Sequence, residues 1–167
     1  MPAVPYSYRG DPAVPPFPDD RPVMVFDGYC GLCSRSVQFM LCHDKAGAFR
    51  FLQAQSVLGT AIYRHYGLAT DNYETVVLLA DGKLHTASEA VLGVLARLGA
   101  PWSYLRVAGI LPRPLRDWLY HLVARHRMRF FGRTEACYLP TPEQSERFLN
   151  GDGTTARKPD AALEGEL

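Results

Sequence analysis

Two cysteines, Cys30 and Cys33, lie where a short apolar stretch gives way to a helical pattern. The stretch 23–26 has the continuous apolar composition of a buried strand, and Asp27-Gly28 follows it as a turn. The pair would therefore stand at the N-terminus of a helix, where backbone N–H groups and the helix dipole stabilise a thiolate. Because the thiolate is the form that attacks disulfides, this arrangement predicts thiol–disulfide exchange.

The two sulfurs are expected to have different roles. Cys30 would lie at the first turn and face solvent, whereas Cys33 begins the apolar stripe of the helix and would be shielded. Cys30 would then attack a substrate disulfide, and Cys33 would resolve the mixed disulfide and release the reduced substrate. We expect Tyr29, Gly31 and Leu32 to contact this substrate, because they flank the cysteines and add no charge beside them.

Asp27 lies three residues before Cys30 and has two interpretations. As a catalytic residue, its carboxylate would help to move the proton of Cys33. As a structural residue, it would form an Asx turn that holds the bend at Gly28. A negative charge beside a thiol also raises the thiol's pKa, which opposes activation. The sequence leaves both interpretations open.

Two other interpretations of the cysteines remain. The pair could be reduced and inert, or it could bind zinc, which requires four ligands. The chain has no second C-x-x-C motif, so Cys137 and one of several histidines would have to complete a zinc site. We therefore expect no metal and no cofactor. Cys42 and Cys137 are expected to be packing residues.

The composition suits a globular protein and excludes some classes. The chain has 167 residues, is 47% hydrophobic and carries a net charge of +1, which does not suggest a nucleic-acid partner. The N-terminus lacks the pattern of a signal peptide, and no stretch is apolar for the roughly 18 residues of a bilayer span. The expectation is a cytoplasmic protein whose partner is a disulfide-containing protein or a small thiol.

The chain is expected to contain four parts. A proline-rich arm covers 1–22, a core covers 23–100, an arginine-rich helical extension covers 101–150, and a flexible polar tail covers 151–167. In the core, strands and helices alternate, and Asp81-Gly82 predicts a hairpin. This order predicts a small mixed α/β sheet flanked by helices, the thioredoxin-like class. The expected elements are strands 23–26, 49–52, 75–79 and 83–85 and helices 30–44, 57–66 and 90–98.

The extension offers a second function. Pro112 and Pro114 divide its helical part, 102–131, and the second piece carries many arginines with few acids nearby. Such a row is usually the solvated face of a helix, but it also suits an acidic or membrane-associated protein partner. In that alternative the domain is a non-catalytic interaction module and the dithiol is vestigial.

The motifs together resemble those of the DCC family of thiol–disulfide oxidoreductases. The resemblance spans about 23–138 and implies a thioredoxin-like fold with Cys30 and Cys33 as the redox pair. It also implies that Ser88 and the arginine-rich block belong to the family's common surface. The matching segments are Asp27–Cys33, Ser34–Val37, His43-Asp44, Phe49–Phe51, Ser88–Ala90, Pro112–Arg116, Tyr120–Arg127 and Phe131–Arg133.

One departure from thioredoxins concerns the loop that faces the dithiol. Thioredoxins have a cis-proline there, and this loop pairs with the substrate backbone. The matching position here is near Thr75, and no proline occurs between Pro22 and Pro101. Substrate binding must therefore differ, and we expect Thr75 and Ser88 to supply contacts from this loop and its neighbour.

Overall fold

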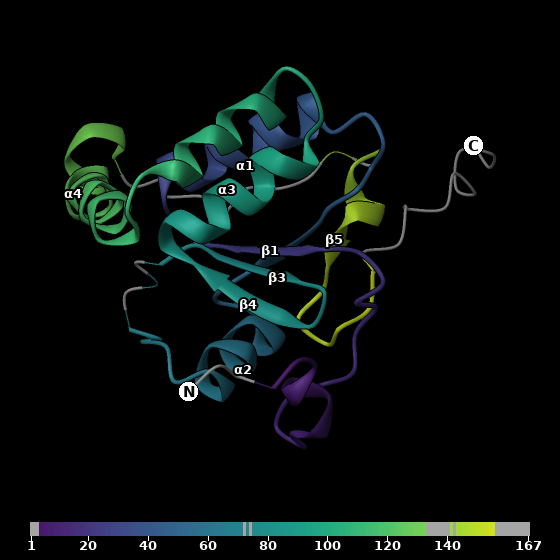
Figure 1. Cartoon of the computed structure of the whole chain (residues 1–167). Coiled ribbons are helices and arrows are strands. Elements are labelled where there is room, and N and C mark those ends of the chain that lie inside the picture. Colours follow the sequence, from purple (N-terminus) through teal and green to yellow (C-terminus); the bar gives the residue numbers. More distant parts are fainter. Residues whose placement is uncertain (1–3, 72, 74, 133–140, 142, 156–167) are drawn as a thin grey trace.

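A five-stranded mixed sheet forms the centre of the molecule in this computed structural model (Figure 1). The structure describes residues 4–71, 73, 75–132, 141 and 143–155. The strand order is β4-β3-β1-β2-β5. The strands are β1 (Val23–Phe26), β2 (Arg50–Gln53), β3 (Val77–Ala80), β4 (Lys83–Thr86) and β5 (Phe148–Leu149).

The pairing confirms the mixed α/β class that the sequence predicts. β1 and β2 are parallel, as a strand–helix–strand unit requires, while β3 is antiparallel to both β1 and β4. The β3–β4 hairpin turns at Asp81 and Gly82, whose φ angles of 53° and 71° are those of a type I′ turn. β5 joins the sheet parallel to β2 and was not predicted.

Helices cover both faces of the sheet (Figure 1). Because side chains alternate along a strand, Met24 and Phe26 of β1 belong to the core cluster on one face, and Val23 and Val25 to the cluster on the other. Burial on both faces accounts for the continuous apolar run of this strand. α1 (Gly31–His43) and α3 (Ala87–Arg97) lie on the first face, and α2 (Val57–His65) lies on the second.

The C-terminal half adds a 3₁₀ segment and a long helix at one end of this layered core. These are η2 (Trp102–Ile110) and α4 (Arg113–Phe131), which are separated at Pro112 as expected. α4 contacts α1 and α3 and lies at the left of the view in Figure 1. Among the helices that the structure describes, none has the length and apolar character needed to cross a membrane.

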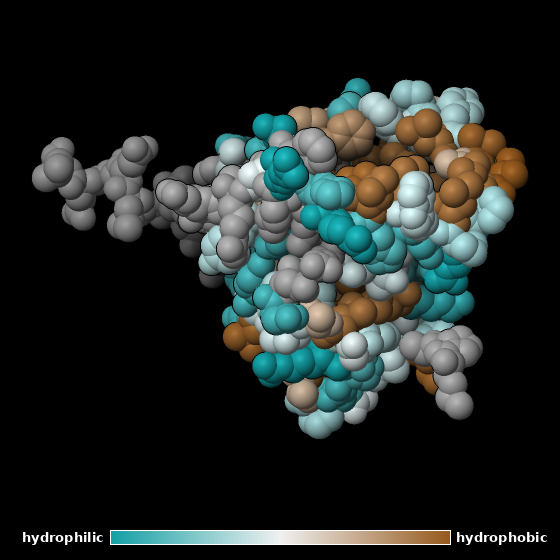
Figure 2. All heavy atoms as spheres, turned by 90° about the vertical axis from the view of Figure 1, so that its left-hand side faces the viewer, coloured by the Kyte–Doolittle hydropathy of each residue, from teal (hydrophilic) through white to brown (hydrophobic). Residues whose placement is uncertain are grey.

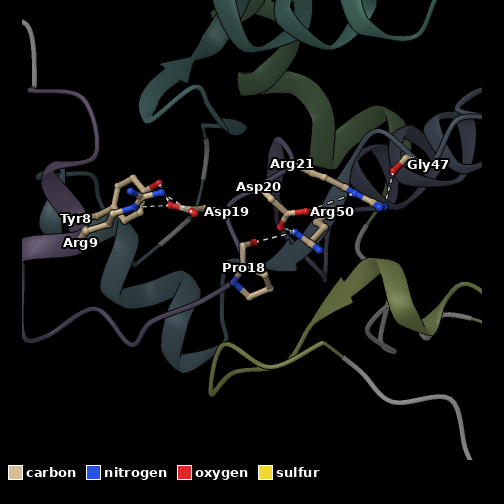
Figure 3. A network of polar contacts seen from close by, with 8 residues as sticks. All are labelled: Tyr8, Arg9, Pro18, Asp19, Asp20, Arg21, Gly47 and Arg50. Carbon is tan, nitrogen blue, oxygen red and sulfur yellow. Dashed lines mark hydrogen bonds and ion pairs between the residues drawn. The ribbon is translucent and has the colours of Figure 1, made fainter.

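The proline-rich arm packs on the core. A short 3₁₀ turn, η1 (Ser7–Gly10), contains Tyr8, which is buried and stacks on Phe17 at a centroid distance of 5.4 Å. The Tyr8 hydroxyl donates a 2.5 Å hydrogen bond to Asp19, which also receives two hydrogen bonds from Arg9 (Figure 3). The hydrogen bond from Arg9 is the main reason why the pKa of the Asp19 carboxyl lies below its usual value.

A second part of the same network joins the arm to β2 and to the loop before it. Arg50 donates to the Pro18 carbonyl at 3.0 Å and forms an ion pair with Asp20, while Arg21 donates to the Gly47 carbonyl at 3.0 Å (Figure 3). The arm therefore holds a defined position beside the α1–β2 connection.

The turn after α1 is built around Asp44. Its buried carboxylate accepts hydrogen bonds from the backbone N–H groups of Ala48 and Phe49, at 2.9 and 3.1 Å. It also forms an ion pair with Arg147 of η3 (Ser145–Arg147). This carboxylate links the α1–β2 turn to the segment that leads into β5.

The segment after β5 contacts the second face. The Gly151 carbonyl accepts from the backbone N–H of Leu58 at 3.0 Å, and Thr155 forms an isolated bridge with Leu149. The remainder of the predicted tail, 156–167, and the predicted packing residue Cys137 lie outside the described residues.

Candidate active site

The dithiol lies where β1 leads into α1, at the expected place in the fold. Cys30 is the N-cap residue of α1, with an extended backbone (φ −92°, ψ 118°). Its sulfur accepts a hydrogen bond from the backbone N–H of Cys33 at an N···S distance of 3.5 Å. The first N–H groups of a helix have no partner within the helix, so a sulfur in this position satisfies one of them, and such a contact favours the thiolate over the thiol.

The expectation that Cys30 faces solvent is wrong. Its exposed fraction is 0%, and that of Cys33 is 4%; both belong to the core cluster that includes Phe26 and Val37. One cause is a long-range contact. The backbone N–H of Gly31 donates to the carbonyl of Gly132 at 3.4 Å, so the end of α4 lies against the first turn of α1.

The buried carboxylate of Asp27 forms the predicted Asx turn. Its Oδ1 atom accepts from the backbone N–H of Tyr29 at 3.0 Å and from the side-chain amide of Gln55 at 2.6 Å. Gln55 in turn accepts from the backbone N–H of Gly28 at 3.1 Å. Gln55 was not predicted, because it follows β2 and approaches the dithiol turn only when β1 and β2 pair.

The loop before β3 is already engaged by other parts of the chain. The Thr75 carbonyl accepts a hydrogen bond from the hydroxyl of Tyr63 at 2.6 Å. The next residue, Val76, donates its backbone N–H to the hydroxyl of Tyr120 on α4 at 3.0 Å. A residue of α4 therefore occupies the backbone N–H of this loop, where the sequence led us to expect substrate contacts. Tyr120 was not singled out as a site residue in the sequence.

Ser88 lies in the first turn of α3 and also contacts α4. The N-cap residue of α3 is Thr86, so the side chain of Ser88 does not cap this helix. Its hydroxyl instead donates to Asp117, and this hydrogen bond is the main reason why the pKa of the Asp117 carboxyl is lowered. Arg113 lies within 3.2 Å of Glu89 and 3.6 Å of Asp117, which strengthens the contact between α3 and α4.

The remaining predicted substrate contacts lie on two different surfaces. Tyr29 is exposed beside the dithiol turn. Leu32 and Cys33, in contrast, line an open cavity of about 520 Å³ between α1, α3, η2 and α4. The structure thus separates an outer surface at Tyr29 from an apolar cavity that the second cysteine borders.

Cys42 lies away from the dithiol, and no metal site accompanies the cysteines that the structure describes. Cys42 is exposed on α1, so its interpretation as a packing residue is wrong: its place on the helix turns it away from the sheet. Within the described ranges, no three His, Cys, Asp or Glu side chains come together as metal ligands. The zinc alternative depended on Cys137, which is not among the described residues.

Sequence comparison gives the family of this chain. The model of the DCC1-like thiol-disulfide oxidoreductase family matches residues 24–133, which contain the dithiol, the sheet except β5, and α4. The chain belongs to this family. The DCC1-like chain is also 36% identical over 127 residues to the uncharacterized protein YuxK of Bacillus subtilis, covering 76% of this chain and 93% of YuxK.

A second relative comes from a plant. The DCC1-like chain is 37% identical over 122 residues to the DCC family protein At1g52590, chloroplastic, of Arabidopsis thaliana, covering 72% of this chain and 71% of that protein. No solved structure matches the chain. The family carries a redox name, and the matched residues include the Cys30–Cys33 pair at the start of α1.

We expect replacement of Gly132 by alanine to expose Cys30. Gly132 has φ +70° and open space where a Cβ atom would lie, so an alanine there would meet backbone strain of about 1–2 kcal/mol without a clash. That strain opposes the Gly31–Gly132 contact. Alkylation of Cys30 by iodoacetamide, located by fragmentation of the labelled peptide, should accelerate about 5- to 30-fold.

Gly67→Ala provides the matched control. Gly67 has φ +65°, equally open surroundings and a position just after α2, away from the dithiol. The same strain there should leave alkylation of Cys30 unchanged. Equal acceleration in the two variants would contradict a local role for Gly132, since the sulfur would then become accessible through general destabilisation.

Proposed function

We propose that this protein exchanges its Cys30–Cys33 dithiol with the disulfide of a protein or of a small thiol compound. The observation that carries the proposal is the N-cap position of Cys30, whose sulfur accepts the Cys33 N–H. The membership in a family named for thiol–disulfide oxidoreductases supports the same chemistry. A thiolate at a helix N-terminus is favoured electrostatically, and the thiolate is the reactive form.

The reaction proceeds in two exchanges. The Cys30 thiolate attacks one substrate sulfur, the substrate S–S bond breaks, and the departing sulfur takes up a proton. The Cys33 sulfur then attacks Cys30 in the mixed disulfide, which releases the reduced substrate and leaves a Cys30–Cys33 disulfide. Two electrons and two protons pass to the substrate. Asp27 holds the turn that precedes Cys30, and we propose it as the proton carrier for Cys33.

The test is a redox equilibrium. The purified protein would be held in graded mixtures of reduced and oxidised dithiothreitol or glutathione, and its thiols would be trapped and mapped by peptide mass spectrometry. Cys30 and Cys33 should titrate together as a single two-electron couple, while the exposed Cys42 serves as an internal reference for an ordinary thiol. If the pair stays reduced across the whole range, it is structural and the proposal fails.

The exposed Cys42 is also informative about the cellular compartment of this protein. Cys42 is free and solvent-exposed, and such a thiol persists most readily in a reducing compartment. We therefore propose the cytoplasm for this chain. The name of the Arabidopsis relative places that protein in the chloroplast.

The second candidate function is a binding module that acts through η2 and α4. Large apolar side chains are exposed on these elements, including Ile110 at 81% and Trp118 at 62%, beside the exposed Arg125 and Arg129. Figure 2 shows hydrophobic side chains gathered on the face that carries α4. The paired substitution Arg125→Glu with Arg129→Glu distinguishes the two functions, because it should abolish capture of an acidic partner and leave disulfide exchange intact.

A further inference from the structure

The cavity beside Cys33 is the least explained feature of the site. Its volume of about 520 Å³ falls within the roughly 300–1,000 Å³ of small-molecule sites. Aliphatic side chains from α1, α3, η2 and α4 form most of its wall, and Cys33 borders it on the α1 side. A smaller cavity of about 300 Å³ adjoins it and shares Cys33, Ser36 and Val76 in its lining.

The polar groups at the wall of the cavity are already occupied, with one exception. The Ser36 hydroxyl donates to the Leu32 carbonyl, the Ser88 hydroxyl to Asp117, and the Tyr120 hydroxyl accepts from Val76. The exception is Arg116. Its Nε atom is buried and meets no hydrogen-bond acceptor in the part of the chain that the structure describes.

The guanidinium of Arg116 therefore offers a positive charge to whatever fills the cavity. A buried donor without an acceptor is costly, and a carboxylate is the acceptor that fits a guanidinium best. The nearest acids are engaged elsewhere: Asp117 accepts from Ser88, and Arg113 bridges Asp117 and Glu89. The Arg116 charge also acts on Asp117, which is its neighbour in the chain.

We infer that this cavity binds an aliphatic carboxylic acid that carries a disulfide or dithiol, with its carboxylate at Arg116 and its sulfurs toward Cys33. The apolar wall suits the hydrocarbon chain, the guanidinium of Arg116, whose buried Nε has no acceptor among the described residues, suits one anionic head group, and Cys33 suits the sulfur-bearing end. The inference rests on the proposed exchange activity and names its substrate class. Lipoate has all three features and is the probe for the test.

The redox step balances without a further reactant. A thiolate of the Cys30–Cys33 pair attacks one ring sulfur of lipoate, the ring S–S bond breaks, and the released sulfur takes up a proton. The other cysteine attacks its partner in the mixed disulfide, and the second ligand sulfur leaves and is protonated. The protein disulfide and dihydrolipoate result, and dihydrolipoate reduces the protein by the reverse path.

Octanoate separates binding from redox chemistry, because it has the chain and the carboxylate but no sulfur. We expect calorimetric titration of the full-length protein to show octanoate binding, and Arg116→Gln to weaken it roughly tenfold or more. Arg106→Gln is the matched control, since Arg106 is an exposed arginine of the neighbouring η2 segment and does not line the cavity. It should leave octanoate affinity unchanged.

Ala124→Trp tests the cavity in a second way. Ala124 lines the cavity from α4, so a tryptophan there should fill it and remove octanoate binding, while far-ultraviolet circular dichroism reports whether the fold persists. Reduction of lipoate should also exceed that of uncharged lipoamide, and Arg116→Gln should abolish this preference.

The outcomes separate this inference from the proposed function. If glutathione disulfide oxidises the pair but octanoate does not bind, or binds equally well to the Arg116 variant, the inference is overturned and the exchange activity stands. Binding of an apolar peptide in place of octanoate would overturn it as well. If octanoate binds through Arg116 but no disulfide oxidises the Cys30–Cys33 pair, the carboxylate site is confirmed. The claim that its ligand is a disulfide substrate of this pair is then overturned.

Discussion

Replacement of Cys30 by serine is expected to abolish disulfide exchange, with a fall in rate of at least about 1,000-fold. The sulfur of Cys30 accepts the Cys33 N–H at the first turn of α1, and a serine hydroxyl in the same place cannot form a disulfide. Turnover of glutathione disulfide by the reduced protein, followed by release of glutathione, measures the loss. Because Cys30 is buried at the N-terminus of α1, thermal unfolding of the variant should be recorded beside its activity.

Two further serine variants complete the experiment. Cys42→Ser is the control, because Cys42 is exposed on the far side of α1 and should contribute nothing to turnover. Cys33→Ser should retain the first attack and lose the second, so a mixed disulfide with glutathione should accumulate on Cys30 and be visible as added mass. Full turnover in the Cys30 variant would show that this residue is not the nucleophile.

Asp44→Asn is expected to lower the free energy of unfolding by about 3 kcal/mol or more. The Asp44 carboxylate accepts two backbone N–H groups and pairs with Arg147, whose side chain is only 17% exposed. An amide in its place leaves the mostly buried guanidinium without its counter-charge and turns an NH₂ group toward donors. Urea-induced unfolding of the reduced protein at neutral pH measures the change.

Asp81→Asn is the matched control for this stability effect. Asp81 also pairs with an arginine, Arg97, but its side chain is 81% exposed, and asparagine tolerates the φ of 53° at this position. An exposed ion pair contributes little, so the expected loss is below about 1 kcal/mol. Equal losses in the two variants would mean that burial of the Asp44 pair is not what makes it important.

Local patterns accounted for most of the fold. The apolar run before Asp27, the helical periodicity after Cys30 and the Asp81-Gly82 turn predicted the strand–helix–strand unit and the hairpin, because each depends on neighbours in the chain. β5 has only two residues, so it carries no periodicity that could reveal it. Its pairing with β2 depends instead on contacts across the fold, such as the Arg147–Asp44 ion pair.

The candidate site was predictable in part, for a similar reason. The position of Cys30 and Cys33 at a helix start follows from local sequence, and so does the Asx turn of Asp27. The burial of Cys30 does not follow from local sequence, because the backbone carbonyl of Gly132, about 100 residues away, covers the turn. A backbone carbonyl has no sequence signature. Tyr120 was not predicted as a site residue for the same reason: one tyrosine on a helix is not distinguished until the helix packs against the core.

The contact between Gly31 and Gly132 makes the dithiol and the α4 surface thermodynamically linked. A macromolecule that binds η2 and α4 better when the end of α4 has moved away would raise access to Cys30. By reciprocity, a change in the dithiol that favours this separation would tighten the binding of the same partner by an equal factor. The redox state of the dithiol and the affinity of the partner would then depend on the same equilibrium. Binding at the exposed apolar face of α4 would therefore change with the oxidation state of Cys30, although solvent does not reach its sulfur.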